Sequence, residues 1–220
     1  MSTTAQRLRR LTAAVLLCVA PLAPADDAGL SRTEAAAALT APKPETRREA
    51  SVRLGEVGTM DDVALLLRSL DDEDDTVRAL AERSIWAIWS RSGDPVVDAL
   101  FAEGAQQLAS RQLANSVQTF TRIIELNPDF AEGWNKRATA LFLAGDLEGS
   151  LRDCDEVLKR NPSHFGVLSG YGLIHARLGH PEQALAFFER ALALNPNMDG
   201  VRANIESLKR DLARKGRQAI

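Results

Sequence analysis

The chain has 220 residues, with 27 Lys and Arg against 30 Asp and Glu and a formal net charge of −3. Hydrophobic residues make up 45% and charged residues 26%, a balance that is typical of globular proteins and excludes a disordered chain. The near-neutral charge excludes the strongly basic surface typical of nucleic-acid-binding proteins, and two cysteines are too few for a disulfide-rich scaffold.

An export leader is predicted at the start of the chain. Three arginines, the last of them Arg10, precede an apolar run over 11–20, and the small residues Ala23-Pro24-Ala25 follow. This order is typical of a secretory signal peptide, here 1–25 with cleavage after Ala25, and the alternative is a buried N-terminal helix. The apolar run is too short to span a membrane. We therefore expect an exported protein, periplasmic or secreted, in the cell envelope of a bacterium.

The region after the leader contains two kinds of segment. Residues 26–45 are expected to form a linker with one short helix, which opens at the capping-box pattern Ser31-x-x-Glu34. Residues 46–93 hold two similar apolar segments that align when Arg47 is matched with Arg78, and an apolar helical stripe lies between them. This order of helices around an acidic loop resembles the short bacterial form of the HEAT repeat, which implies a pair of packed helices.

The acidic run 71–75 has two interpretations. A calcium loop of the EF-hand type needs a glycine at its sixth position, and Thr76 stands there. We therefore expect its Asp residues to cap the following helix, 77–89.

Trp86 lies on the opposite side of that helix from its main apolar face. We expect it to pack against the first helix of the repeats described next. The alternative is an exposed aromatic anchor for a partner protein.

The strongest pattern is an internal repeat. Asn-Pro recurs with a constant spacing of 34 residues, at 127–128, 161–162 and 195–196. Counting back from each Pro gives three contiguous units, 97–130, 131–164 and 165–198. Their eighth and twentieth positions are always small, which lets two antiparallel helices cross closely, and their fourth position is always large: Leu100, Trp134 and Leu168.

These columns resemble the tetratricopeptide repeat. The resemblance implies an all-α fold, an α-solenoid of three helix hairpins preceded by the HEAT-like helices. The segment 199–220 has apolar residues at helical spacing and a basic end, and it is expected to be a C-terminal capping helix and tail.

The resemblance also implies a groove lined by the first helix of each unit. The positions that face the groove in this family give these candidates for partner binding: Phe101, Leu108, Asn135, Thr139, Phe142, Ser169, Leu173 and Arg177. Some members of the family grip a terminal carboxylate with a Lys where this chain has Phe101, so that type of clamp is not expected. An extended or helical protein segment is the expected ligand.

Residues with the spacing of a catalytic or metal site are not found. His175 and His180 lack a third ligand at a suitable spacing, and Cys154 occupies a core column, so no metal and no cofactor is expected.

The sequence therefore predicts a monomeric, non-catalytic adaptor or scaffold, without nucleic-acid binding and without a membrane span in the mature chain. The alternative is a structural component of a cell-envelope complex, acting through self-association or as an accessory subunit of an enzyme.

Overall fold

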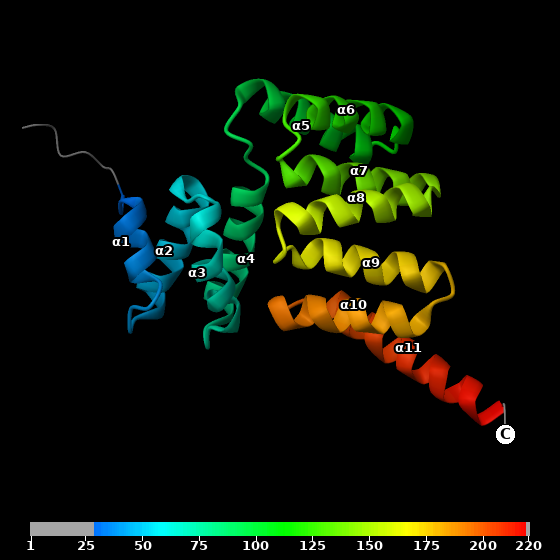
Figure 1. Ribbon diagram of the computed structural model, residues 1–220. Coiled ribbons are helices and arrows are strands. Elements are labelled where there is room, and N and C mark those ends of the chain that lie inside the picture. The colour runs from blue at the N-terminus through cyan, green and yellow to red at the C-terminus, as the bar shows by residue number, and fades with distance from the viewer. Residues whose placement is uncertain (1–28, 219–220) are drawn as a thin grey trace, which may run out of the picture.

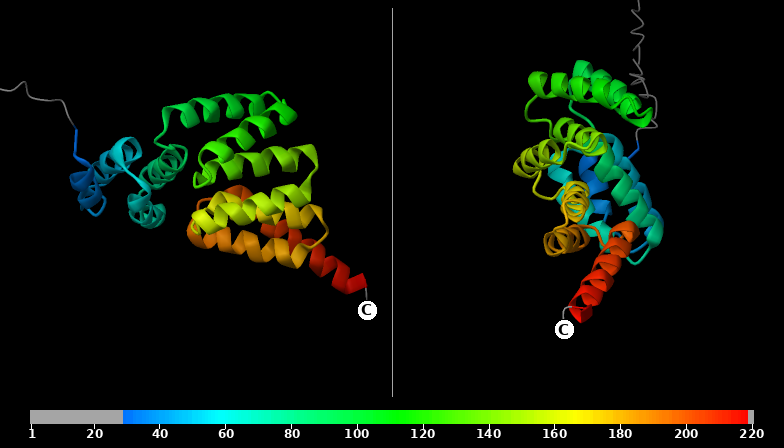
Figure 2. Two further views of the ribbon diagram at one scale, coloured as in Figure 1. Left: turned by 45° about the horizontal axis from the view of Figure 1, so that its top comes forward. Right: turned by 90° about the vertical axis from the view of Figure 1, so that its right-hand side faces the viewer.

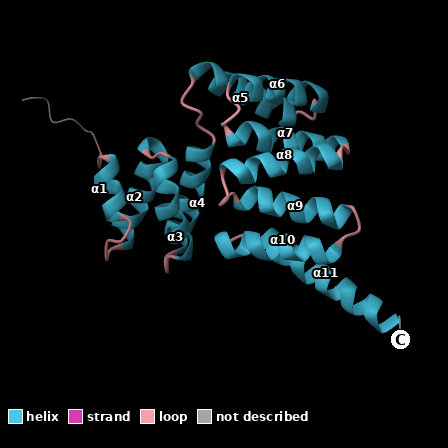
Figure 3. Ribbon diagram, viewed as in Figure 1, coloured by secondary structure: helices cyan, strands magenta, loops and turns pink. Residues whose placement is uncertain are grey.

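The computed structural model describes residues 29–218, and every regular element in this range is helical (Figure 3). The predicted all-α solenoid is confirmed. The predicted leader, 1–25, lies outside the described residues. The helices in chain order are α1 (Arg32–Ala38), α2 (Pro44–Val57), η1 (Met60–Asp62), α3 (Val63–Arg68), η2 (Ser69–Asp71), α4 (Asp75–Trp89), α5 (Pro95–Ala109), α6 (Leu113–Leu126), α7 (Ala131–Ala144), α8 (Leu147–Arg160), α9 (Phe165–Arg177), α10 (Pro181–Leu194) and α11 (Asp199–Gln218).

Helices α1 to α4, which we call the front block, pack around one aliphatic core. Leu54 on α2, Leu66 on α3 and Ile85 on α4 have no exposed surface. The region predicted as a linker is part of this core, because α1 buries Ala35 and its neighbour Leu39 against α2. The expected capping box at the start of α1 is present. The sequence does not predict this burial, because the helix within 26–45 is too short to show an apolar face.

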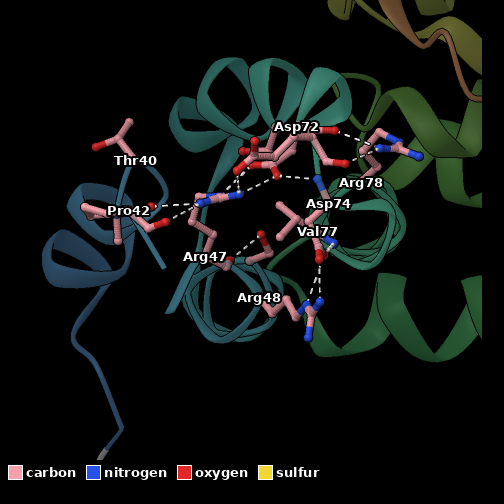
Figure 4. Close-up of polar contacts among 12 residues, drawn as sticks. Thr40, Pro42, Arg47, Arg48, Asp72, Asp74, Val77 and Arg78 are labelled. Carbon is pink, nitrogen blue, oxygen red and sulfur yellow. Dashed lines mark hydrogen bonds and ion pairs between the residues drawn. The ribbon is translucent and has the colours of Figure 1, made fainter. Parts of the chain in front are cut away.

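The acidic loop of the front block is held by arginines from α2 (Figure 4). Arg47 is buried and donates to both carboxylate oxygens of Asp72, at 2.7 and 2.8 Å. Asp74 pairs with Arg48 and accepts the backbone N–H of Val77 at 2.9 Å, so it caps α4 as the sequence predicts. Hydrogen bonding to Arg48 lowers the pKa of Asp74 to about 2.

Helices α5 to α11, which we call the repeat stack, form three hairpins and a final helix that extends past them (Figures 1 and 2). The small residues predicted at the helix crossings sit against large partners. A Cβ atom on Gly172 would lie 2.4 Å from the ring of Phe188, and one on Gly104 would lie 2.9 Å from the ring of Phe120. The first and third hairpins therefore close by aromatic rings packed directly on backbone.

The front block docks where successive repeats are connected, with α4 against the ends of the repeat helices (Figure 1). Phe165, at the start of α9, and Met198 join the apolar core of the front block. The side chain of Arg78 donates to Asn197 at 3.1 Å, and Asn197 donates to the carbonyl of Leu70 at 2.8 Å. Both apolar and polar contacts thus fix the front block on the repeat stack.

Candidate functional site

Helices α7 and α9, the first helices of the second and third units, border an open pocket of about 180 Å³. Its wall is largely apolar and includes Ala138, Cys154 and Ile174. Gly170 leaves space on the α9 side, because a Cβ atom there would have no neighbour within 4 Å. Five residues predicted from the sequence line this pocket: Asn135, Thr139, Phe142, Ser169 and Leu173.

Arg177, another predicted residue, lies beside the pocket next to Phe142. Its guanidinium carbon is 5.3 Å from the centre of the Phe142 ring, and one nitrogen donates to the Phe142 carbonyl at 3.3 Å. The side chain is otherwise exposed. It therefore presents positive charge and free N–H groups at this end of the pocket.

The two predicted residues of the first unit do not line this pocket. Phe101 is half-buried, with its ring 5.9 Å from Phe120 and 5.5 Å from Phe130 in edge contacts, so it packs within the first hairpin. Leu108 is half-buried on α5. The part that these two residues play in binding stays a prediction.

A buried polar network lies behind Asn135. The amide nitrogen of Asn135 donates to both carboxylate oxygens of Glu132, at 3.2 and 3.0 Å. His164 is fully buried, and its Nδ1 accepts the backbone N–H of Val167 at 3.1 Å. The ring proton is therefore on Nε2, which donates to Glu132 at 2.5 Å.

Glu132 is ionised in this network. Burial raises the pKa of a carboxyl group, but the hydrogen bond from His164, the nearby Lys136 and the bond from Asn135 together lower the pKa of Glu132 below its usual value. The Lys136 ammonium is 3.8 Å from the carboxylate. The repeat pattern does not reveal this network, since it depends on a histidine at the last position of one unit facing a glutamate at the second position of the same unit.

Trp86 does not pack on the first repeat helix, so that prediction is wrong. Its ring makes edge contacts with His164 and Phe165, both at 5.5 Å between centres, where the second unit meets the third. A Cβ atom on Gly166 would lie 2.6 Å from the Trp86 ring, so glycine is what lets α4 approach α9 here. Trp89 stacks on His164 at 4.3 Å. Trp86 remains half-buried, with Lys136 5.7 Å from its ring centre.

Cys154 is a free, buried cysteine in the wall of the pocket. Burial raises the pKa of the Cys154 thiol to about 12, so it stays protonated. Within 29–218 there is no group of three or more side chains suited to a metal ion. No helix in that range combines the length and apolarity that a membrane crossing requires.

Comparison with known proteins places the repeats in a family. Models of the tetratricopeptide repeat match residues 101–164 and 165–198. A TPR repeat-containing protein of Rhizobium etli is 30% identical over 57% of this chain and 61% of its own length. Tetratricopeptide repeat protein 36 of Danio rerio is 31% identical over 42% of this chain and 51% of its own length. The chain thus covers less than two thirds of these relatives.

Two solved structures are similar in fold. The first TPR domain of Spaghetti, bound to the HSP90 peptide SRMEEVD, has a TM-score of 0.51 and 21% identity, covering 53% of this chain and 93% of that domain. The Sgt2 TPR domain of Aspergillus fumigatus has a TM-score of 0.54 and 21% identity, covering 58% and 85%. Together with the spacing of the units and the hairpins of the stack, the family models show that residues 101–198 of this chain are tetratricopeptide repeats.

Proposed function

We propose that this chain is a non-catalytic adaptor that binds an extended segment of a partner protein in the groove between α7 and α9. The observation that carries the proposal is the convergence of five predicted groove residues on one open pocket, with Arg177 beside it. The Spaghetti domain, similar in fold, is bound to a peptide, which supports a peptide as the ligand class.

The pocket sets the length of the segment. Asn135 and Phe142 are seven residues apart on α7, which is about 10 Å at the helical rise of 1.5 Å per residue. An extended chain covers about 3.3 Å per residue, so about three residues fill the groove. The apolar wall favours apolar or proline residues in the middle of the segment.

A groove-filling variant tests the proposal. Gly170→Trp places a large ring in the pocket without a clash at Cβ, and Gly200→Trp on α11 is the matched control, because it also has open space around its Cβ. Native protein and both variants are used to select binders from a random heptapeptide library. We expect enrichment with the native protein and Gly200→Trp and its loss with Gly170→Trp. Equal enrichment with all three proteins would reject the groove.

We also propose that the adaptor acts outside the cytoplasm. The support is the leader-like pattern of 1–25. N-terminal sequencing of the protein from a cell-envelope extract should begin at Asp26. A chain that is found only in the cytosol and still carries Met1 would overturn this proposal.

Self-association is the second candidate function, and one feature of α11 favours it. Here α11 runs past the last hairpin (Figure 2). An open hollow of about 520 Å³ at this place is lined by apolar residues and by charged ones: Ala176, Pro181, Leu208, Leu212, Asp211, Arg214 and Lys215. Light scattering over a hundredfold concentration range decides between the two: a constant monomer mass rejects assembly. A rising mass that Leu212→Glu abolishes would favour assembly through this hollow.

A further inference from the structure

The groove has two chemically different ends, and this polarity constrains what it can bind. Resting on the proposed function, we infer that the groove prefers a segment with a hydrogen-bond donor, an ammonium or an amide N–H, at Asn135 and a carboxylate about 10 Å away at Arg177. The inference concerns the order of charges along the ligand, which the proposed function leaves open.

The orientation of the Asn135 amide carries the first half of the inference. An ionised carboxylate has no proton to donate, so Glu132 can only accept, and the amide nitrogen of Asn135 must turn toward it. The amide oxygen is then on the other side of the group. No described residue donates to that oxygen, and Asn135 lines the pocket. The pocket therefore receives a hydrogen-bond acceptor at this point.

The neighbouring hydroxyl groups do not reverse this polarity. Thr139 donates its hydroxyl proton to the backbone carbonyl of Asn135 at 3.0 Å, which leaves only lone pairs for a ligand. Ser169 can donate or accept. The Asn135 end of the pocket is thus acceptor-rich, whereas the guanidinium of Arg177 is a pure donor.

The front block prevents the polar network from reorienting. His164 is locked by its bond from Val167 and by the stacked ring of Trp89, and it holds the second side of Glu132. Lys136 adds a positive charge 3.8 Å from the same carboxylate. Turning the Asn135 amide over would place its oxygen against a buried negative charge, which is strongly unfavourable. Glu132 and His164 are therefore positioning residues for the groove.

A set of blocked hexapeptides tests the inference. In a polyproline II helix, side chains three residues apart lie on one side and about 9 Å apart, which suits the two ends of the groove. Acetyl-GKPPEG-amide places an ammonium and a carboxylate at that spacing. The comparison peptides are GEPPEG, GKPPKG and the neutral GAPPAG with the same blocked ends. Binding is followed by NMR titration of the backbone amides of residues 166–170.

We expect GKPPEG to bind at least tenfold tighter than GEPPEG and GKPPKG in the native protein. Glu132→Gln frees the Asn135 amide to turn, so it should bring GEPPEG close to GKPPEG and leave the penalty of GKPPKG unchanged. Arg177→Gln should bring GKPPKG close to GKPPEG and leave the penalty of GEPPEG unchanged. Arg152→Gln, at an exposed arginine on α8 that does not line the pocket, is the matched control for Arg177→Gln and should keep the tenfold preference. Helical circular dichroism confirms that each variant is folded.

If GEPPEG binds as tightly as GKPPEG in the native protein, or if GKPPEG binds no tighter than GAPPAG, the inference is wrong. The library selection with Gly170→Trp decides the proposed function separately. If the library selection enriches peptides but the hexapeptides bind equally well, the groove is an adaptor site and only the inferred charge order is wrong.

Discussion

The front block and the repeat stack are both built from short antiparallel helices, but different contacts hold them. In the front block, the acidic loop is held by two ion pairs, Arg47 with Asp72 and Arg48 with Asp74. Neither pair has an equivalent elsewhere in the block. In the repeat stack, one contact is made again in the next unit: the hydroxyl of Ser116 donates to the carbonyl of Gly104 at 3.1 Å, and that of Ser150 donates to the carbonyl of Ala138 at 2.8 Å. Recurring contacts leave a period in the sequence, whereas single contacts do not.

The largest expected effect compares how much the same repeat position contributes to the free energy of unfolding in two units. Phe188→Ala removes a fully buried ring from the third hairpin and should lower the free energy of unfolding by about 4 kcal/mol. Cys154→Ala, at the same column of the second unit, removes one sulfur atom and should cost about 1 kcal/mol. Urea denaturation measures both values. Equal losses would show that the column does not have the role that the repeat assigns to it.

The next prediction asks whether the two regions unfold together. Trp89→Ala removes the ring that stacks on His164 at the junction, and it should cost about 3 kcal/mol and split one thermal transition into two. Trp134→Ala is the control, because Trp134 packs inside the repeat stack between Arg137 and Arg160. It should lower the transition without splitting it. A single transition in Trp89→Ala, measured by calorimetry, would mean that other junction contacts suffice.

A smaller loss is expected from overpacking a helix crossing. Ala138→Leu adds three carbons where α7 crosses α8, and it should cost about 2 kcal/mol. Ala144→Leu at the exposed end of the same helix should leave stability nearly unchanged. Chemical denaturation of both variants provides the check. If Ala138→Leu is as stable as the native chain, the register of the second unit is wrong.

The smallest effect is the pH dependence that the acidic loop of the front block contributes. The pKa values of Asp72 and Asp74 are lowered by their arginine partners, that of Asp74 to about 2. A depressed folded pKa gives stability that is complete above pH 4 and is lost as the pH falls toward 2. Arg48→Met should therefore flatten the decline of stability between pH 4 and 2. Arg68→Met, at an exposed site, should not change the slope in the same urea titrations.

The sequence predicted the repeat stack closely because its information is local and recurrent. The units at 131 and 165 begin where α7 and α9 begin, and α5 starts two residues before its unit because Asp94 caps it and Pro95 suits its first turn. Five of the predicted residues in the second and third units line one pocket for the same reason. Trp86 was misplaced because nothing in a helical pattern states which distant element will cover it.

The buried network behind the groove was also beyond sequence reasoning. Glu132 and His164 lie at ordinary positions of their unit, and neither residue type marks a binding site alone. Trp86 and Trp89 of α4 pack against His164 at the connection between the second and third units. A sequence pattern within one unit does not predict that contact. The amide nitrogen of Asn135, which the sequence predicts only as a groove residue, is engaged by Glu132 in this network.

The link between Arg78 and Asn197 bears on how this protein can evolve. Solenoids ordinarily grow and shrink by duplication or loss of whole units, because each unit contacts only its neighbours. Here the front block reaches the connection after the first unit, where Ile88 and Phe130 border one hollow, as well as those after the second and third. A unit inserted before Asn197 would move this residue away from Arg78 and break the hydrogen bond between them. A change in the number of units within 97–198 would therefore cost the chain its contacts between the front block and the last connection.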